Sequence, residues 1–166
     1  RARFVLIGSM NPEEGRLRPQ ILDRFGLRVV TRGLAAKQER LEAYRRSIAF
    51  HTNPRRVVMD YAETLERMRL EVVAARQALP SVRLSPQAEK AGLKIIQSLG
   101  IASLRAESTL FDASRAHAVA DGREQATPAD VKAVAPMTLR LRRSAFMQDF
   151  FHNQAREETE LRRLIR

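Results

Sequence analysis

Three helix starts of the same kind are spread along this chain, and they limit its fold more than any other feature. A capping residue stands directly before a proline at Asn53-Pro54, Ser85-Pro86 and Thr127-Pro128. Such a residue satisfies free amides of the first helical turn, and proline at the first helical position loses no hydrogen bond. Asp130 completes a capping box in its acidic form. The sequence therefore predicts a chain that is more than half helical.

Apolar residues recur at helical spacing after these starts and also from Leu34 onward. The glycines at 100 and 122 are expected C-caps, and Pro80 is expected to end the long helix that follows Asn53. Pro136 is expected to kink or break the helix that begins at Thr127. The last predicted helix is amphipathic and starts at Ser144. The apolar stripe predicted for the long helix consists of Val58, Tyr61, Ala62, Leu65, Met68, Val72 and Leu79.

Two short apolar runs near the start of the chain have the character of buried strands. Phe4–Ile7 ends at Gly8, and Leu27–Val30 follows a stretch that can hold about one helical turn. We expect these runs to be parallel neighbours, with Asn11 at the carboxyl end of the first. A chain that opens inside a buried strand without an initiating methionine is expected to come from a longer protein. The predicted fold class is mostly α with a remnant of a parallel α/β sheet.

Composition excludes several classes of function. The 166 residues are 44% apolar, contain no cysteine and carry a net charge of +11, so a hydrophobic core is expected and thiolate chemistry is excluded. No apolar run approaches the roughly 18 residues that a membrane span needs. The three histidines are far apart and none has a metal-ligand spacing. No G-x-x-x-x-G-K-[ST] phosphate loop occurs, so the chain alone is not expected to hold a nucleotide.

Asn11, Asp23 and Arg24 are the candidates for a functional site. An asparagine after a buried strand presents an amide at the sheet edge where α/β proteins bind ligands, and it can orient a water molecule. Asp23-Arg24 ends the short helix next to Phe25, which can anchor it. An arginine there can project a fixed guanidinium toward a neighbouring subunit. That group suits the charge of a phosphoryl-transfer transition state.

The stretch from Phe4 to Gly26 closely resembles the sensor-1 strand and arginine-finger helix of the magnesium chelatase ATPase subunits, which are AAA+ proteins. The resemblance covers about residues 3–145, and its first block is the most specific part. It continues through Asn53-Pro54, residues 78–85, residues 103–107, and residues 126–131 to the basic run Arg140-Leu141-Arg142-Arg143.

The resemblance implies roles for four residues. Asn11 matches sensor 1, Arg24 the arginine finger, Asp23 the acidic partner just before it, and Arg105 the sensor-2 arginine of the lid. As cofactors it implies ATP and Mg²⁺, both requiring the upstream part of the family's proteins. A homo-oligomeric ring and other chelatase subunits are the implied partners. The family inserts Mg²⁺ into protoporphyrin IX, in the cytoplasm or, in plants and algae, the chloroplast stroma.

The implied domain organisation has four parts. Residues 1–52 form the C-terminal part of the AAA+ α/β core, 53–83 a long linker helix, 84–143 the helical lid, and 144–166 an amphipathic C-terminal helix. The chain departs from the family pattern at Ala106, where glycine is usual, and from residue 144 onward. A chelatase-like paralogue, including a relative of cobalt chelatase, is therefore an alternative.

Other functions remain open at this point. The high positive charge also fits nucleic-acid binding, but the basic residues are dispersed over nearly every helix with few aromatics between them. A nucleic-acid remodelling motor of the AAA+ class shares Asn11 and Arg24, and a non-enzymatic assembly module is the third alternative. The structural alternative for Arg24 is an ion pair with Asp23 or Asp112. The alternative for Asn11 is a simple Asn-Pro turn.

Overall fold

A computed structural model describes residues 4–11, 13, 15, 17–142, 154 and 160–164 of the chain. More than half of the chain is helical, as predicted, and the fold is mostly α with one small parallel sheet. The terminal helix expected from Ser144, with its cluster of phenylalanines, lies outside the described residues apart from Gln154 and residues 160–164, which are helical. Among the described helices, none combines the length and the apolar character that crossing a membrane requires.

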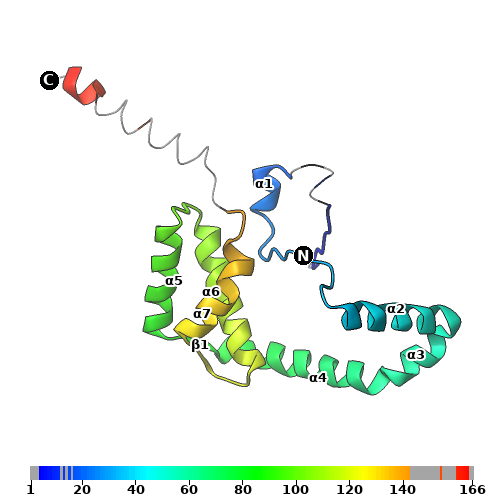
Figure 1. Ribbon diagram of the computed structural model, residues 1–166. Coiled ribbons are helices and arrows are strands. Elements are labelled where there is room, and N and C mark those ends of the chain that lie inside the picture. The colour runs from blue at the N-terminus through cyan, green and yellow to red at the C-terminus, as the bar shows by residue number, and fades with distance from the viewer. Residues whose placement is uncertain are drawn as a thin grey trace.

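Helices α2 (Lys37–Thr52), α3 (Pro54–Asp60) and α4 (Ala62–Ala78) form an arm that extends from the rest of the molecule (Figure 1). The short helix α1 (Pro19–Leu22) precedes them in the chain. The Asn53 side chain caps α3 as predicted, accepting a hydrogen bond of 3.1 Å from the backbone N–H of Arg56. The predicted long helix is interrupted at Tyr61, and a 3₁₀ turn, η2 (Leu79–Ser81), contains Pro80 where the helix was expected to end.

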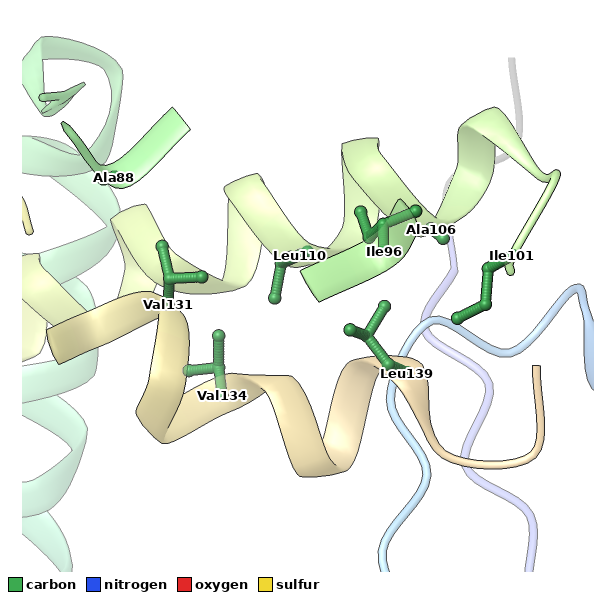
Figure 2. Packing of buried hydrophobic residues seen from close by; sticks show 8 residues of the cluster. All are labelled: Ala88, Ile96, Ile101, Ala106, Leu110, Val131, Val134 and Leu139. Atoms are coloured by element: carbon green, nitrogen blue, oxygen red, sulfur yellow. The ribbon is translucent and has the colours of Figure 1, made fainter. Parts of the chain in front are cut away.

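A three-helix bundle of α5 (Pro86–Ser98), α6 (Leu104–Ala120) and α7 (Pro128–Leu139) holds the hydrophobic core (Figures 1 and 2). Ser85 caps α5, accepting from the N–H of Ala88 at 3.1 Å. Gly100 and Gly122 have positive φ after α5 and α6, which is the C-cap conformation that glycine favours. The buried cluster drawn in Figure 2 is Ala88, Ile96, Ile101, Ala106, Leu110, Val131, Val134 and Leu139.

A two-residue parallel sheet joins the starts of two bundle helices, and sequence analysis missed it. Strand β1 (Arg83–Leu84) pairs with β2 (Gln125–Ala126) in the register Arg83 to Gln125 and Leu84 to Ala126. Each strand leads directly into the capping residue of a helix, α5 or α7. Such short strands carry no periodic signal, and only the packing of the helices after them brings them together.

The two strands expected near the start of the chain are not formed. Phe4–Ile7 and Leu27–Val30 both have extended or irregular backbone without a ladder, and Phe4 and Ile7 are 81% and 90% exposed. A strand needs a neighbour for its N–H and C=O groups, and two isolated strands are marginal in water. Neither run has a strand partner among the described residues. The backbone N–H of Arg28 instead donates to the carbonyl of Met137 in α7, at 2.7 Å.

Helix α7 continues through Pro136 to Leu139, so the expected break does not occur. Pro136 stands in the last turn of the helix, where the loss of its N–H removes only one hydrogen bond. Thr138 and Leu139 beyond it are buried, and Leu139 belongs to the core cluster. Packing of this last turn against the bundle therefore outweighs the cost of the proline.

The apolar stripe predicted for the long helix is present but uncovered. Leu65, Met68 and Val72 are each more than half exposed, and no residue of α2, α3 or α4 is buried. We call this exposed set, from Val58 to Val72 on α3 and α4, the arm stripe. The core of the chain consequently lies in the bundle alone.

Candidate functional site

The Asp23-Arg24 pair lies in a turn that directly follows α1. Two backbone hydrogen bonds tie this turn to α1. The N–H of Arg24 donates to the carbonyl of Ile21, and the N–H of Phe25 donates to the carbonyl of Leu22. A side chain added at Gly26 would contact Thr109, so this turn packs closely against α6. The first candidate residues therefore sit against the bundle, although they belong to the start of the chain.

Asp23 is held by two arginines of the bundle, Arg105 in the first turn of α6 and Arg142 after the end of α7. Nη1 of Arg142 donates to Oδ1 of Asp23 at 2.7 Å, and Nη1 of Arg105 donates to Oδ2 at 3.0 Å. The Arg142 side chain is only 1% exposed, whereas that of Arg105 is 61% exposed. Both carboxylate oxygens of Asp23 are thus engaged, and Arg142 makes the more strongly shielded of the two ion pairs.

Arg28 adds a second connection between this turn and the bundle. Its guanidinium donates to the carbonyls of Leu22 and Arg140, and its Nε is buried without a hydrogen-bond partner among the described residues. Burial lowers the pKa of Arg28 below the ordinary arginine value, and the nearby charge of Arg142 adds to this effect, while Asp23 opposes it. Asp23, Arg28, Arg105 and Arg142 are called the Asp23 cluster below.

Arg24 is not part of the Asp23 cluster. It is exposed, and its guanidinium makes no hydrogen bond or ion pair with the part of the chain that the structure describes. Neither structural partner considered for it pairs with it here: Asp23 binds Arg105 and Arg142, and Asp112 lies 3.5 Å from Arg115. Among the described residues Arg24 is therefore an unpaired cation, and both carboxylate oxygens of the preceding residue, Asp23, are bound by arginines.

Asn11 occupies an exposed turn. Its Oδ1 accepts a hydrogen bond of 3.2 Å from the backbone N–H of Glu13, which is the local turn geometry typical of asparagine. The segment before it passes the same turn as Arg24, because a side chain added at Gly8 would lie 3.8 Å from the ring of Phe25. The structure brings Asp23 and Arg105 into direct contact, and it brings the Asn11 segment alongside Phe25.

Arg142 and Arg28 are the residues that sequence reasoning did not single out. Arg28 carried a recognisable signal, since a charged residue inside the apolar run Leu27–Val30 is expected to find a buried partner. Arg142 lies in the basic run after α7, where four positions offer three arginines. Nothing in that run distinguishes the buried arginine from the exposed Arg140.

A second cluster of charged groups caps helix α7. Asp130 is 1% exposed and accepts from both Nη atoms of Arg123, from the backbone N–H of Thr127 at 2.7 Å, and lies 2.7 Å from His117 Nδ1. The bond from Arg123 is the main reason that the pKa of Asp130 is held far below its ordinary value. We call these residues the Asp130 network.

The Asp130 network is also the place where carboxylate and imidazole ligands come closest together among the described residues. His117, Asp121 and Asp130 offer ligand atoms within 4.8 Å of one another. Arg123 already donates to Asp130 and to Asp121, so a guanidinium occupies the place between the carboxylates. This donor set fits a helix cap and does not fit a divalent metal ion.

Comparisons with known proteins agree on one family. The AAA lid domain model matches residues 91–164. The magnesium-chelatase subunit ChlI homolog of Methanocaldococcus jannaschii is 39% identical over 147 residues, which is 87% of this chain and 40% of that protein. The magnesium-chelatase 38 kDa subunit of Acidiphilium rubrum is 41% identical over 141 residues, covering 85% of this chain and 41% of that protein.

A solved structure supports the fold. A crystal structure assigned as an ATPase, from Cytophaga hutchinsonii, covers 77% of this chain and 41% of its own, with a TM-score of 0.56 and 22% identity. The chain thus belongs to the AAA+ ATPase family that includes the magnesium-chelatase ChlI subunits. It spans about two fifths of the length of the two curated relatives described above.

Proposed function

We propose that this chain supplies the arginine finger and both sensor residues of a ring-forming AAA+ ATPase that drives metal insertion into a tetrapyrrole. In this proposal Arg24 reaches the nucleotide of the neighbouring subunit, Asn11 orients the attacking water, and Arg105 contacts the nucleotide from the lid. Residues 1–52 belong to the α/β core, 53–83 link it to the lid at 84–143, and 144–166 form the terminal helix.

The state of Arg24 carries the proposal. A finger arginine acts by meeting charge that grows on the γ-phosphate oxygens in the transition state, so it must be both fixed and unpaired. Arg24 is exposed and unpaired within the described part of the chain, while Asp23 beside it is bound by Arg105 and Arg142. A structural ion pair would leave the guanidinium neutralised, which is not the arrangement found.

The described residues fit the phosphate end of ATP better than they fit Mg²⁺. Arg24 offers a guanidinium that is unpaired among the described residues for phosphate oxygens, whereas the adjacent carboxylate, Asp23, accepts from two arginines whose positive charge disfavours a metal ion there. The Mg²⁺ ligands and the phosphate loop are therefore proposed to come from residues outside these 166. We accordingly expect the 166-residue chain alone to show no Mg²⁺-dependent ATP hydrolysis, measured by phosphate release.

The decisive test uses the intact protein that carries this chain together with its phosphate loop. Arg24→Ala should lower kcat for ATP hydrolysis by about 10³-fold or more, because finger arginines contribute about 10³ to 10⁵ in rate. Nucleotide binding and the thermal midpoint should stay nearly unchanged. Lysine should rescue poorly, since it keeps the charge but loses the planar fork.

Mixed rings show whether Arg24 acts across an interface. When wild-type and Arg24→Ala subunits are combined, activity should fall faster than the mutant fraction rises, because each variant subunit disables its neighbour's site. A strictly proportional decline would show that each subunit acts alone and would contradict the proposal. A large drop in thermal midpoint for Arg24→Ala would point instead to a structural ion pair.

The metal and the substrate need a separate assay. Assembled with the other chelatase subunits, the ring should support ATP-dependent insertion of Mg²⁺ into protoporphyrin IX, followed by the fluorescence of the product. Insertion of Co²⁺ into a tetrapyrrole, with no Mg²⁺ insertion, would assign the chain to a cobalt-chelatase-like relative. ATPase activity that rises on adding DNA and falls steeply with salt would favour a nucleic-acid remodelling motor.

A further inference from the structure

The residues on both sides of Arg24 are bound by the same buried side chain. Arg142 donates through Nη1 to the Asp23 carboxylate at 2.7 Å, and its Nη2 lies 3.4 Å from the Phe25 carbonyl. Asp23 and Phe25 immediately precede and follow Arg24 in the sequence. A single guanidinium therefore holds the backbone turn from which the Arg24 side chain projects.

Arg142 is in turn fixed to the bundle. Its Nε donates to the carbonyl of Thr138 at 2.7 Å, and Nη2 lies 3.3 Å from Oγ1 of Thr109. These contacts come from the last turn of α7 and the second turn of α6. The planar fork of the guanidinium allows one side chain to bind the Arg24 turn and the bundle at the same time.

The backbone just before Arg142 adopts a conformation that leucine rarely takes. Leu141 has a φ of 58°, in the left-handed region that is strained for a side chain with a Cβ. Among the described non-glycine residues it is the only one with positive φ. The strained residue stands at the position that turns the chain after α7 and presents Arg142 to Asp23.

We infer that Arg142 is a positioning residue for Arg24, fixing the turn that carries the finger to the α6–α7 end of the bundle. This inference rests on the proposed function, since it needs Arg24 to act in hydrolysis. Arg142 does not contact the nucleotide in this account. It acts through Asp23 and the Phe25 carbonyl, so its removal leaves Arg24 chemically intact but free to move.

The test compares Arg142→Met with Arg115→Met in the intact ATPase ring. Arg115 is a matched control because its guanidinium also binds backbone carbonyls of the same bundle, those of Val82 at 2.8 Å and Leu79 at 3.0 Å. Arg115 connects α6 to the segment that follows α4, whereas Arg142 connects the bundle to the turn that carries Arg24. Both variants should lower the thermal midpoint to a similar extent.

Only Arg142→Met should impair catalysis. We expect kcat to fall by about 10²-fold, the cost of misplacing a catalytic group by about 1 Å, while KM for ATP changes less than about threefold. Arg142→Lys should recover only part of this loss, because one ammonium group cannot make the same set of contacts. Arg115→Met should keep kcat within about threefold of wild type.

The double variant Arg24→Ala with Arg142→Met separates the two hypotheses. If Arg142 acts through Arg24, the double variant should be no slower than Arg24→Ala alone. If Arg24→Ala leaves the ATPase rate unchanged, the proposed function fails. If Arg24→Ala abolishes activity but Arg142→Met behaves like Arg115→Met, only the positioning role fails.

Amide hydrogen exchange provides a readout that needs no ATPase activity. The N–H groups of Arg24 and Phe25 are bonded within the turn after α1, so Arg142→Met and Arg142→Lys should both accelerate their exchange in the 166-residue chain. Amides in the middle of α6 should be unaffected in the lysine variant. Unchanged exchange at residues 24 and 25 would overturn the inference.

Discussion

At the scale of single residues, the molecule uses its few paired acids in two different ways. Asp23 is 31% exposed at its side chain and joins two distant parts of the chain, whereas Asp130 is buried at the start of one helix. Both carboxylates are satisfied mainly by arginines. With many more basic than acidic residues in the chain, a buried carboxylate here is surrounded by potential partners, and which one binds is set by geometry.

Asp130 should make folding sensitive to acid. Its pKa is lowered in the folded state, chiefly by the bond from Arg123, so the folded chain takes up a proton at Asp130 only below the pH at which the unfolded chain does. The stabilisation is complete above the ordinary carboxyl pKa and is lost as the pH falls below about 4. Urea unfolding between pH 2.5 and 6 should show a shallower pH dependence for Asp130→Asn than for wild type.

Replacing Asp130 should also be costly at neutral pH. Asp130→Ala removes one partner of a buried, hydrogen-bonded pair and the cap of α7, for which we expect a loss of about 3–5 kcal/mol in the free energy of unfolding. Asp121→Ala is the control, because that carboxylate is exposed and pairs with the same Arg123, so its loss should cost under about 1 kcal/mol. Equal losses for the two would show that burial of Asp130 does not matter.

At the scale of helices, α5 packs closely against α6 at Gly92. Gly92 is buried in α5, and a Cβ added there would lie 2.4 Å from Cε1 of Phe111 and 3.3 Å from a methyl carbon of Leu110. Glycine inside a helix is normally unfavourable by about 1 kcal/mol relative to alanine. Here the absence of a side chain makes room for the aromatic ring of the neighbouring helix.

Gly92→Ala should therefore destabilise the chain despite the gain in helix propensity. We expect a net loss of about 1–2 kcal/mol, since overpacking costs about 1–3 kcal/mol and the propensity gain offsets only part of it. Chemical denaturation of the single variant and of Gly92→Ala with Phe111→Leu tests the cause. The smaller side chain at 111 should restore part of the loss. If the Phe111→Leu substitution does not reduce the destabilisation caused by Gly92→Ala, the cause is not overpacking against Phe111.

The elements that sequence analysis predicted well are those with local signals. Asn53 and Ser85 cap helices as expected, and Gly100 and Gly122 follow α5 and α6 with the positive φ of C-cap glycines. The misplaced elements depend on partners distant in sequence. The run Phe4–Ile7 has strand character but no neighbouring strand, and β1 and β2 are too short to show a period, so neither could be judged from local pattern.

The candidate site likewise contains residues that the sequence predicts and residues whose role depends on distant partners. Asn11, Asp23 and Arg24 were identified from their positions in the sequence and Arg105 through the family resemblance, and the structure shows that Asp23 contacts Arg105. Arg142 could not be found by either route. Its importance comes from burial beside Asp23, and burial of one arginine among several neighbours is decided only when α6, α7 and the turn after α1 are packed together.

At the scale of the whole molecule, a small closed bundle contrasts with an open arm. The buried core belongs to α5, α6 and α7 and the short segments beside them, and α2 to α4 contribute no buried residue. Stability of the isolated chain should therefore reside in the bundle. The arm stripe contributes apolar surface that is uncovered in this chain.

Substitutions in the arm and in the bundle should have clearly different effects on the free energy of unfolding. Leu65→Gln, Met68→Gln and Val72→Gln should each change the free energy of unfolding of the bundle by less than about 0.5 kcal/mol, because the residues are exposed. Leu110→Ala should cost about 3–5 kcal/mol, since this side chain is fully buried in the core. Thermal unfolding followed by circular dichroism measures both. A large loss from the stripe variants would mean that the arm packs against something in solution.

The pairing of Asp23 with Arg142 also has a consequence for the order in which the protein is made. The two residues are 119 positions apart, and the arginine belongs to a segment that leaves the ribosome long after the aspartate. The turn that carries Arg24 can therefore be synthesised early but cannot be set in place until α7 and the residues after it have emerged. If Arg24 acts as proposed, a nascent chain that lacks Arg142 should not yet hold the Arg24 turn in place, so assembly through that residue should wait until α7 and Arg142 have been synthesised.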